Sequence, residues 1–188
     1  MTFATEPTLN IDATPLAITA YFSGERREML VILWCCALAL VLAGALYAVA
    51  KDGFATGFGI VALLAALLLA STAAALLQRG PAQQARLVAA VAGAQAQQAI
   101  AAEATRMDAV IGNYKYYRYG AIGLSLLALL GAAITRNGAV NGAAAGLLLL
   151  AAAQMAVDHY SEHRARGYAG QLGAWAPPGQ AQGSAGRH

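Results

Sequence analysis

Long apolar stretches alternate with short polar breaks along this chain, and their lengths predict helices that cross a membrane. Residues 29–50, 54–77, 119–135 and 139–157 contain no charged side chain. About 20 apolar residues in a helix cross the roughly 30 Å hydrocarbon core of a bilayer, so each stretch predicts one transmembrane helix. The third stretch is short, and we expect Arg118 to extend it by reaching toward the headgroups.

The breaks within each half of the chain are very short. Lys51-Asp52-Gly53 separates the first two apolar stretches, and Arg136-Asn137-Gly138 separates the last two. Such short connections make neighbouring helices antiparallel, so we predict two hairpins, over 29–78 and 119–157. Asp-Gly and Asn-Gly also favour a left-handed helix exit at the glycine. The likeness of the two turns is explained either by an internal duplication or by convergent turn chemistry.

A polar segment, 79–118, lies between the two halves. Pro81 predicts the start of a separate amphipathic helix that runs to about Ile111, because proline suits an early helical position and good helix formers follow it. Its charged residues exclude a fifth transmembrane helix. The aromatic and basic run 114–119 is typical of a membrane–water interface, and we expect no nucleic acid to bind it. Apolar residues recur in this helix at spacings of mostly three or four: Leu87, Val91, Ala94, Ile100, Ala104, Met107 and Ile111.

The flanking segments are polar. Residues 1–13 and 177–188 have the composition of disordered tails. Residues 14–28 predict a short amphipathic helix and a charged collar; this helix lies either in the membrane interface or against the bundle. Residues 158–176 predict a polar extension of the last transmembrane helix. No cleavable signal peptide is expected, so the first apolar stretch itself would direct insertion.

The distribution of positive charge predicts orientation. The chain carries 12 lysines and arginines, of which only Lys51 and Arg136 lie in the two tight turns. Positive residues stay on the cytoplasmic side of short loops, so both termini and 79–118 are predicted to be cytoplasmic. Of all residues 59% are hydrophobic and 11% are charged, with a mean hydropathy of +0.54, which excludes an ordinary soluble domain.

These observations predict an all-α integral membrane protein: four transmembrane helices, arranged as two antiparallel hairpins joined by a cytoplasmic amphipathic helix. A bacterial inner membrane suits such a chain best. The expected partners are the lipid bilayer and another membrane protein or a second copy of the chain.

The interiors of the predicted spans offer little chemistry. They hold no acidic, basic or histidine side chain, and a coupled transporter usually needs one. The adjacent Cys35 and Cys36 cannot close a disulfide without strain and are expected to serve as small apolar side chains. No catalytic residue and no cofactor is predicted.

The cytoplasmic rim is richer in polar side chains. A pair of histidines four residues apart could join nearby carboxylates in a metal site, although no Glu-x-x-His motif of a di-iron bundle occurs. The alternative is a collar of salt bridges that registers the helix ends, in which Glu25 or Glu28 would meet Arg106, Arg164 or Arg166. The metal-ligand candidates are Glu28, Glu103, His159, Glu162 and His163.

Glycines spaced by four form a small face on the last apolar stretch. Gly138, Gly142 and Gly146 would allow close packing within one chain, or serve as a seam between copies. The function that we expect is therefore non-enzymatic and based on contacts: an accessory or structural membrane protein, for example an immunity protein or a subunit of a complex. A small transporter or channel and a metal-dependent enzyme at the rim are the alternatives.

Overall fold

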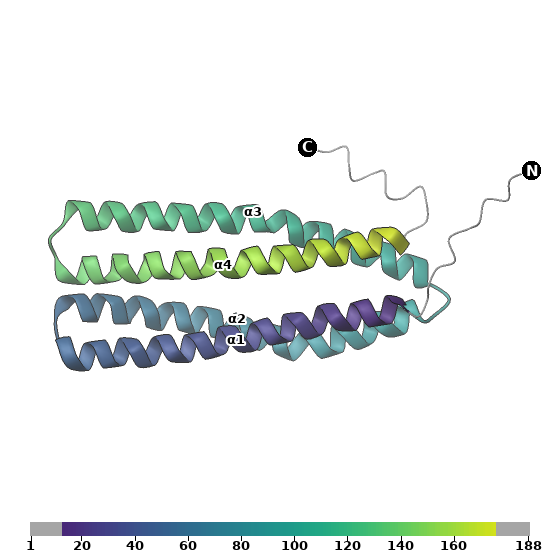
Figure 1. Cartoon of the computed structure of the whole chain (residues 1–188), viewed down its shortest axis with the longest axis horizontal. Helices are drawn as coiled ribbons and strands as arrows, with labels where there is room; N and C mark the ends of the chain where they lie inside the picture. Colours follow the sequence, from purple (N-terminus) through teal and green to yellow (C-terminus); the bar gives the residue numbers. More distant parts are fainter. Residues whose placement is uncertain (1–12, 176–188) are drawn as a thin grey trace, which may run out of the picture.

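The computed structural model describes residues 13–175, which form four long helices (Figure 1). They are α1 (Ala13–Ala50), α2 (Gly53–Val91), α3 (Ala96–Ile134) and α4 (Gly138–Trp175). All four are long and apolar enough to cross a membrane, which confirms the predicted all-helical class. The predictions for 1–12 and 176–188 concern residues outside the described part.

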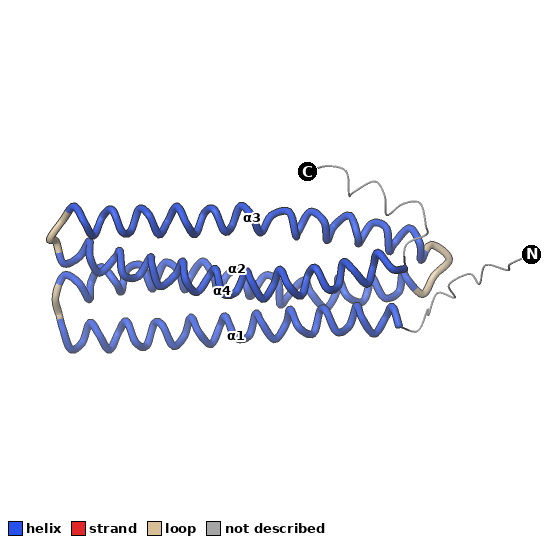
Figure 2. Tube along the Cα trace, turned by 45° about the horizontal axis from the view of Figure 1, so that its top comes forward, coloured by secondary structure: helices blue, strands red, loops and turns tan. Residues whose placement is uncertain are grey.

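The helices run up and down along one long axis (Figures 1 and 2). α1 packs along α2, α3 packs along α4, and α2 and α4 pack against each other in the middle. Across residues 13–175 the backbones of α1 and α3 do not approach each other. The bundle therefore has a diamond-shaped cross-section, with α2 and α4 on its short diagonal. The links α1–α2 and α3–α4 lie together at one end, and the link α2–α3 lies at the other.

The prediction that Pro81 starts a separate helix is wrong. Pro81 lies inside α2, which continues to Val91, and the chain turns only at residues 92–95. An interior proline lacks an N–H donor and costs about 3 kcal/mol. Burial beyond the proline offsets this cost, because Val91 is in a hydrophobic core that Leu87 and Val88 also contact. The break falls at Gly93 instead, where backbone hydrogen bonds from Gly93 to Ala90 and from Ala96 to Gly93 close the turn.

The other segments of 79–118 and the N-terminal region also join the long helices. The aromatic run 114–119 lies within α3, which continues without a break from Ala96 into the third apolar stretch. Ile18, Tyr21 and Phe22 are buried in the same core as Val91, so residues 14–28 pack on the bundle as the first turns of α1. α4 continues beyond the last apolar stretch to Trp175, as the polar extension predicts.

Each helix is about twice as long as a bilayer core. At 1.5 Å per residue, 38 or 39 residues span about 57 Å, against about 30 Å of hydrocarbon. We call the half that contains the four apolar stretches the apolar half, and the half that ends at residues 92–95 the polar half.

The apolar half is built with large side chains outside and small ones inside. Trp34 is 77% exposed and Val49 is 86% exposed, and many leucines of the apolar stretches are also exposed. Apart from Met29, at the border with the polar half, the buried positions there hold small residues: Cys36, Ala43, Ala55, Gly57, Ala66, Ala73, Ala121, Ala128, Gly142, Ala144, Gly146 and Ala151. Leucine gains nothing by leaving lipid for protein, whereas small residues let helices approach closely. This arrangement suits a lipid environment.

The polar half reverses the arrangement. Its core contains large side chains from all four helices, and Ile18, Met107 and Leu172 have almost no exposed surface. Burying an apolar side chain of this size away from water contributes about 1.5–3 kcal/mol. The polar half therefore packs like a water-soluble four-helix bundle.

The closest backbone approach in the apolar half joins α2 to α4. A Cβ added at Gly57 would collide with the carbonyl oxygen of Ala139, and one added at Gly142 would collide with that of Phe54. The glycine face of α4 thus contacts α2 of the same chain, which favours packing within one chain over a seam between copies.

The two tight turns use aspartate and asparagine as helix caps. Asp52 Oδ1 accepts from the N–H of Ala55 at 2.8 Å, and Asn137 Oδ1 accepts from Ala139 at 2.9 Å. The left-handed backbone conformation expected at a glycine is adopted by Lys51 instead, with φ 48°. Side-chain capping of the next helix, rather than glycine at a helix exit, explains Asp-Gly and Asn-Gly here.

The apolar half has a pseudo-two-fold relation between its two helix pairs. Gly57 and Gly142 make reciprocal contacts, and buried small residues recur at the same sequence offset: Cys36 with Ala121, Ala43 with Ala128 and Ala66 with Ala151. The pseudo-two-fold axis that relates the two helix pairs runs along the length of the bundle, as in a parallel repeat. This supports the internal duplication.

We expect Gly57→Val to destabilise the protein strongly, because the side chain must displace the backbone of α4. Overpacking costs about 1–3 kcal/mol or more. The matched control is Gly59→Val, two residues along the same helix, where an added Cβ meets no atom within 4 Å. Thermal unfolding in detergent should show a large fall in Tm for the first variant and a small change for the second. Equal changes would contradict the close approach.

Candidate functional site

An ion pair joins α1 to α4 where the apolar half meets the polar half. Arg164 Nη1 lies 2.5 Å from Glu28 Oε2, and the Ser161 hydroxyl donates to Glu28 Oε1. Gly24 leaves room for this arginine, because a Cβ there would lie 3.1 Å from Arg164 Cδ. Both charged side chains are mostly buried, so each depends on the other for neutralisation.

A second ion pair lies beside the first and belongs to α3. Arg106 donates from Nη2 to Glu103 Oε1 at 2.6 Å and from Nε to Oε2 at 2.8 Å. Glu103 is 6% exposed, and the Tyr168 hydroxyl of α4 reaches its Oε1 at 3.5 Å. The bidentate fork is the stronger geometry for an arginine–carboxylate pair.

Two tyrosines connect the ion pairs. The rings of Tyr21 and Tyr168 stack at 4.4 Å with 15° between their planes. The guanidinium of Arg164 lies 5.6 Å from the centre of the Tyr21 ring, within the range of a cation–π contact. We call the whole set of residues from α1, α3 and α4 the clasp: Tyr21, Glu25, Glu28, Glu103, Arg106, Ser161, Arg164 and Tyr168.

The clasp has more carboxylates than guanidinium groups. Burial raises the pKa of Glu25 above its ordinary value, and the positive charges of Arg164 and Arg106 act in the opposite direction. Glu28 and Glu103 raise this pKa further. Burial also raises the pKa of Tyr114, to about 12. Burial and the neighbouring carboxylates therefore disfavour the charged form of Glu25, and the Tyr114 hydroxyl stays protonated at neutral pH.

A third ion-pair group joins α3 to α4 at the surface. Glu162 accepts from Arg118 Nη2 at 2.6 Å and from Arg166 Nη2 at 2.5 Å. One helical turn away, Gln154 donates to Asp158 Oδ1 at 2.8 Å. Burial raises the pKa of Asp158, against the hydrogen bond from Gln154 and the charge of Arg118.

The metal-ligand candidates do not converge. Glu28, Glu103 and Glu162 each face an arginine, whereas His159 and His163 lie exposed on α4. Nowhere in residues 13–175 do three His, Cys, Asp or Glu side chains gather as metal binding needs. Glu28 and Glu162 instead pair with arginines of neighbouring helices, and Glu103 pairs with Arg106 of its own helix.

The interaction candidates divide between two places. Glu25, Arg106 and Arg164 lie in the clasp, and the three glycines of α4 lie against α2. Sequence reasoning missed Tyr21, Ser161 and Tyr168. Tyr21 and Glu28 lie two turns apart on α1, as Ser161 and Tyr168 do on α4, and this spacing could have signalled a shared face.

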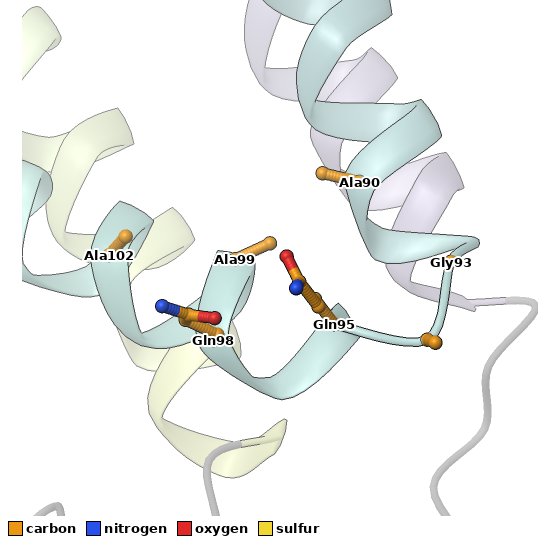
Figure 3. A pocket seen from close by; sticks show the side chains of 7 residues that line it. Ala90, Gly93, Gln95, Gln98, Ala99 and Ala102 are labelled. Atoms are coloured by element: carbon orange, nitrogen blue, oxygen red, sulfur yellow. The ribbon is translucent and has the colours of Figure 1, made fainter.

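The end of the polar half is open and uncharged. A hollow of about 540 Å³ lies at the α2–α3 link, lined by alanine, glycine and glutamine (Figure 3). Gln95 and Gln98 supply its only side-chain polar groups, and neither is a nucleophile or a base.

Exposed tyrosines mark the border between the halves. Tyr116, Tyr117, Tyr119 and Tyr160 all lie more than half exposed on α3 and α4, close to the ion pairs of Glu162. Tyrosine is enriched at membrane–water interfaces.

The chain matches no protein-family model, no curated protein and no solved structure at a significant level. Its own residues are therefore the guide to function.

We expect Glu25→Gln to stabilise the protein at neutral pH. A carboxyl group whose pKa is raised on folding stabilises the native state below its unfolded pKa, and this stability is lost as pH rises through the folded pKa. Glutamine removes the disfavoured charge, so the gain, below about 1 kcal/mol for a partly solvated group, should appear at pH 7–8 and vanish toward pH 4. Tm measured across this pH range checks it, with Arg27→Gln as an exposed control. A loss of stability at pH 8 would contradict the assignment.

Proposed function

We propose that this chain is a non-enzymatic accessory protein of a bacterial inner membrane, which acts by binding another membrane protein. The observation that carries the proposal is the closed packing between α2 and α4. Gly57 and Gly142 leave no space between these helices for even a methyl group, so α2 and α4 leave no room between them for a water-filled path at this level.

The distribution of charged groups supports the same function. The four apolar stretches carry no charged side chain, and Glu28 and Glu103 of the clasp are held by arginines and hydroxyl groups. A polar half that rises from the membrane as a packed four-helix bundle is suited to presenting a surface. The partner is a membrane protein or a second copy of the chain.

We further propose that the polar half and both termini are cytoplasmic. Ten of the 12 basic residues lie on this side of the apolar stretches, and Lys51 and Arg136 lie on the other.

Reporter fusions test this orientation. Alkaline phosphatase, which is active only outside the cytoplasm, should be active when inserted after Asp52 and inactive when inserted after Gly93. A fluorescent protein that folds in the cytoplasm should give the opposite pattern at the same two positions. Phosphatase activity at Gly93 would reverse the proposed orientation.

Cross-linking and flux measurements test the accessory function. We expect a photo-reactive residue at exposed Gln98 to give one discrete cross-linked product in native membranes, while the same residue at exposed Trp34 gives mainly lipid adducts. Proteoliposomes of the purified chain should show ion flux no greater than empty vesicles. Flux that rises with the amount of protein, or no discrete product at Gln98, would contradict the proposal.

A further inference from the structure

A notch opens to lipid between α2 and α3 in the apolar half. The backbones of these two helices approach each other over only a short distance, and α4 forms the floor between them. The cavity measures about 140 Å³. Its walls and floor are almost entirely apolar, and include Ala65, Leu68, Leu69, Ala121, Leu124 and Ala151.

The size and lining of the notch suit part of an acyl chain. An apolar cavity of roughly 150 Å³ stays free of water and accepts a benzene-sized molecule. All of the lining residues lie within the uncharged stretches, at the depth of lipid tails. In a bilayer, the acyl chain of a lipid is therefore available to fill the notch.

Two arginines lie on the cytoplasmic side of the notch, one on each wall. Arg118 comes one turn before Ala121 on α3. Arg79 follows Ala65 on α2 by about four turns, so it lies on the same face of that helix. Both arginines are exposed.

The register of the helices brings the side-chain ends of these arginines toward one level. α2 and α4 run in the same direction, with Gly57 against Gly142, so Arg79 is level with Arg164 of α4. Arg118 reaches Glu162 of α4 at 2.6 Å, half a turn from that level. The two guanidinium groups thus lie beyond the notch on its two walls, and Arg79 follows Leu69, the nearest lining residue of α2, by about 15 Å of helix.

The charges around the top of the notch sum to a positive value. Arg79, Arg118 and Arg166 contribute the positive charges; Glu162 and Asp158 contribute the negative ones. Each guanidinium has five N–H donors, and the contacts with Glu162 leave donors of Arg118 free. Arginine donors pair well with phosphate oxygens. The exposed Tyr117 on the same wall lies at the expected depth of the headgroups.

We propose that an anionic phospholipid binds here, with one acyl chain in the notch and its phosphate between Arg79 and Arg118. The lipid is held by two independent features, an apolar cavity and a pair of cations above it. This gives the α2–α3 face a specific lipid, in addition to the lipids that surround the bundle generally.

Lipid titration of the purified full-length chain in mild detergent tests the headgroup. Phosphatidylglycerol should raise Tm in a concentration-dependent way, and phosphatidylcholine with the same acyl chains should not. Arg79→Gln and Arg118→Gln should each weaken the apparent affinity for phosphatidylglycerol about tenfold, as expected for loss of a charged hydrogen bond. Arg26→Gln on α1, across the bundle, is the matched control and should leave the affinity unchanged.

Filling the notch tests the acyl chain. Ala65→Phe should abolish the stabilisation by phosphatidylglycerol, whereas Ala74→Phe, on the opposite face of α2 and exposed, should preserve it. If Ala65→Phe lowers Tm without lipid, Leu124→Phe on the other wall serves as the second filling variant. Equal stabilisation by phosphatidylcholine, an effect of Arg26→Gln as large as that of Arg118→Gln, or full stabilisation by glycerol phosphate without acyl chains would overturn the proposal.

Discussion

The contact between the backbones of α2 and α4 at Gly57 and Gly142 sets the geometry of the whole bundle. Each glycine lies against a carbonyl oxygen of the other helix, so neither helix can slide or rotate without a collision. α1 and α3 then pack on the outer sides of this central pair. In lipid, attraction between apolar side chains does not hold helices together. Close packing of small residues does so instead. The glycines therefore do in the apolar half what the large buried side chains do in the polar half.

The register fixed by this contact extends into the polar half. The turns of α1 and α4 that carry Glu28 and Arg164 meet because α2 and α4 are already aligned, and the ion pair then joins α1 to α4 directly. Removing one partner of such a pair leaves a charge without compensation and costs more than the pair contributes. Tyr21 and Tyr168 fill the space between the two ion pairs. The clasp thus forms because the helices are in register, and its ion pairs then stabilise that register.

Much of the fold could be predicted from the sequence, because the apolar stretches and tight turns are local signals. Their lengths predict four helices, and the turns at Asp52 and Asn137 predict which helices are neighbours. The break predicted at Pro81 does not occur, because the penalty for an interior proline is local, whereas the burial of Val91 that offsets it depends on α1 and α3. The left-handed residue was also misplaced, since Asp52 acts as a cap and Lys51 takes the positive φ.

The candidate site was less predictable. Glu25, Glu28, Arg106 and Arg164 could be selected as charged residues near helix ends, but their pairing depends on the rotation of each helix about its axis. The weak amphipathicity of these helices does not define that rotation. Arg106 pairs within its own helix at Glu103, a choice that spacing permits and does not require. The notch between α2 and α3 arises where two helices fail to meet, and no pattern along a single helix records such a gap.

The unbroken course of α3 and α4 has a mechanical consequence. Each runs from the tight turn at Asn137 into the polar half as one rod, and a helix of this kind bends only gently. α4 is fixed against α2 at Gly142, close to its first residue. A force applied at the far end of α4, near Trp175, must therefore swing the rod about this fixed end. The lipid-facing surface of α4 then moves in the same direction as the far end, by a distance that decreases toward the glycine contact.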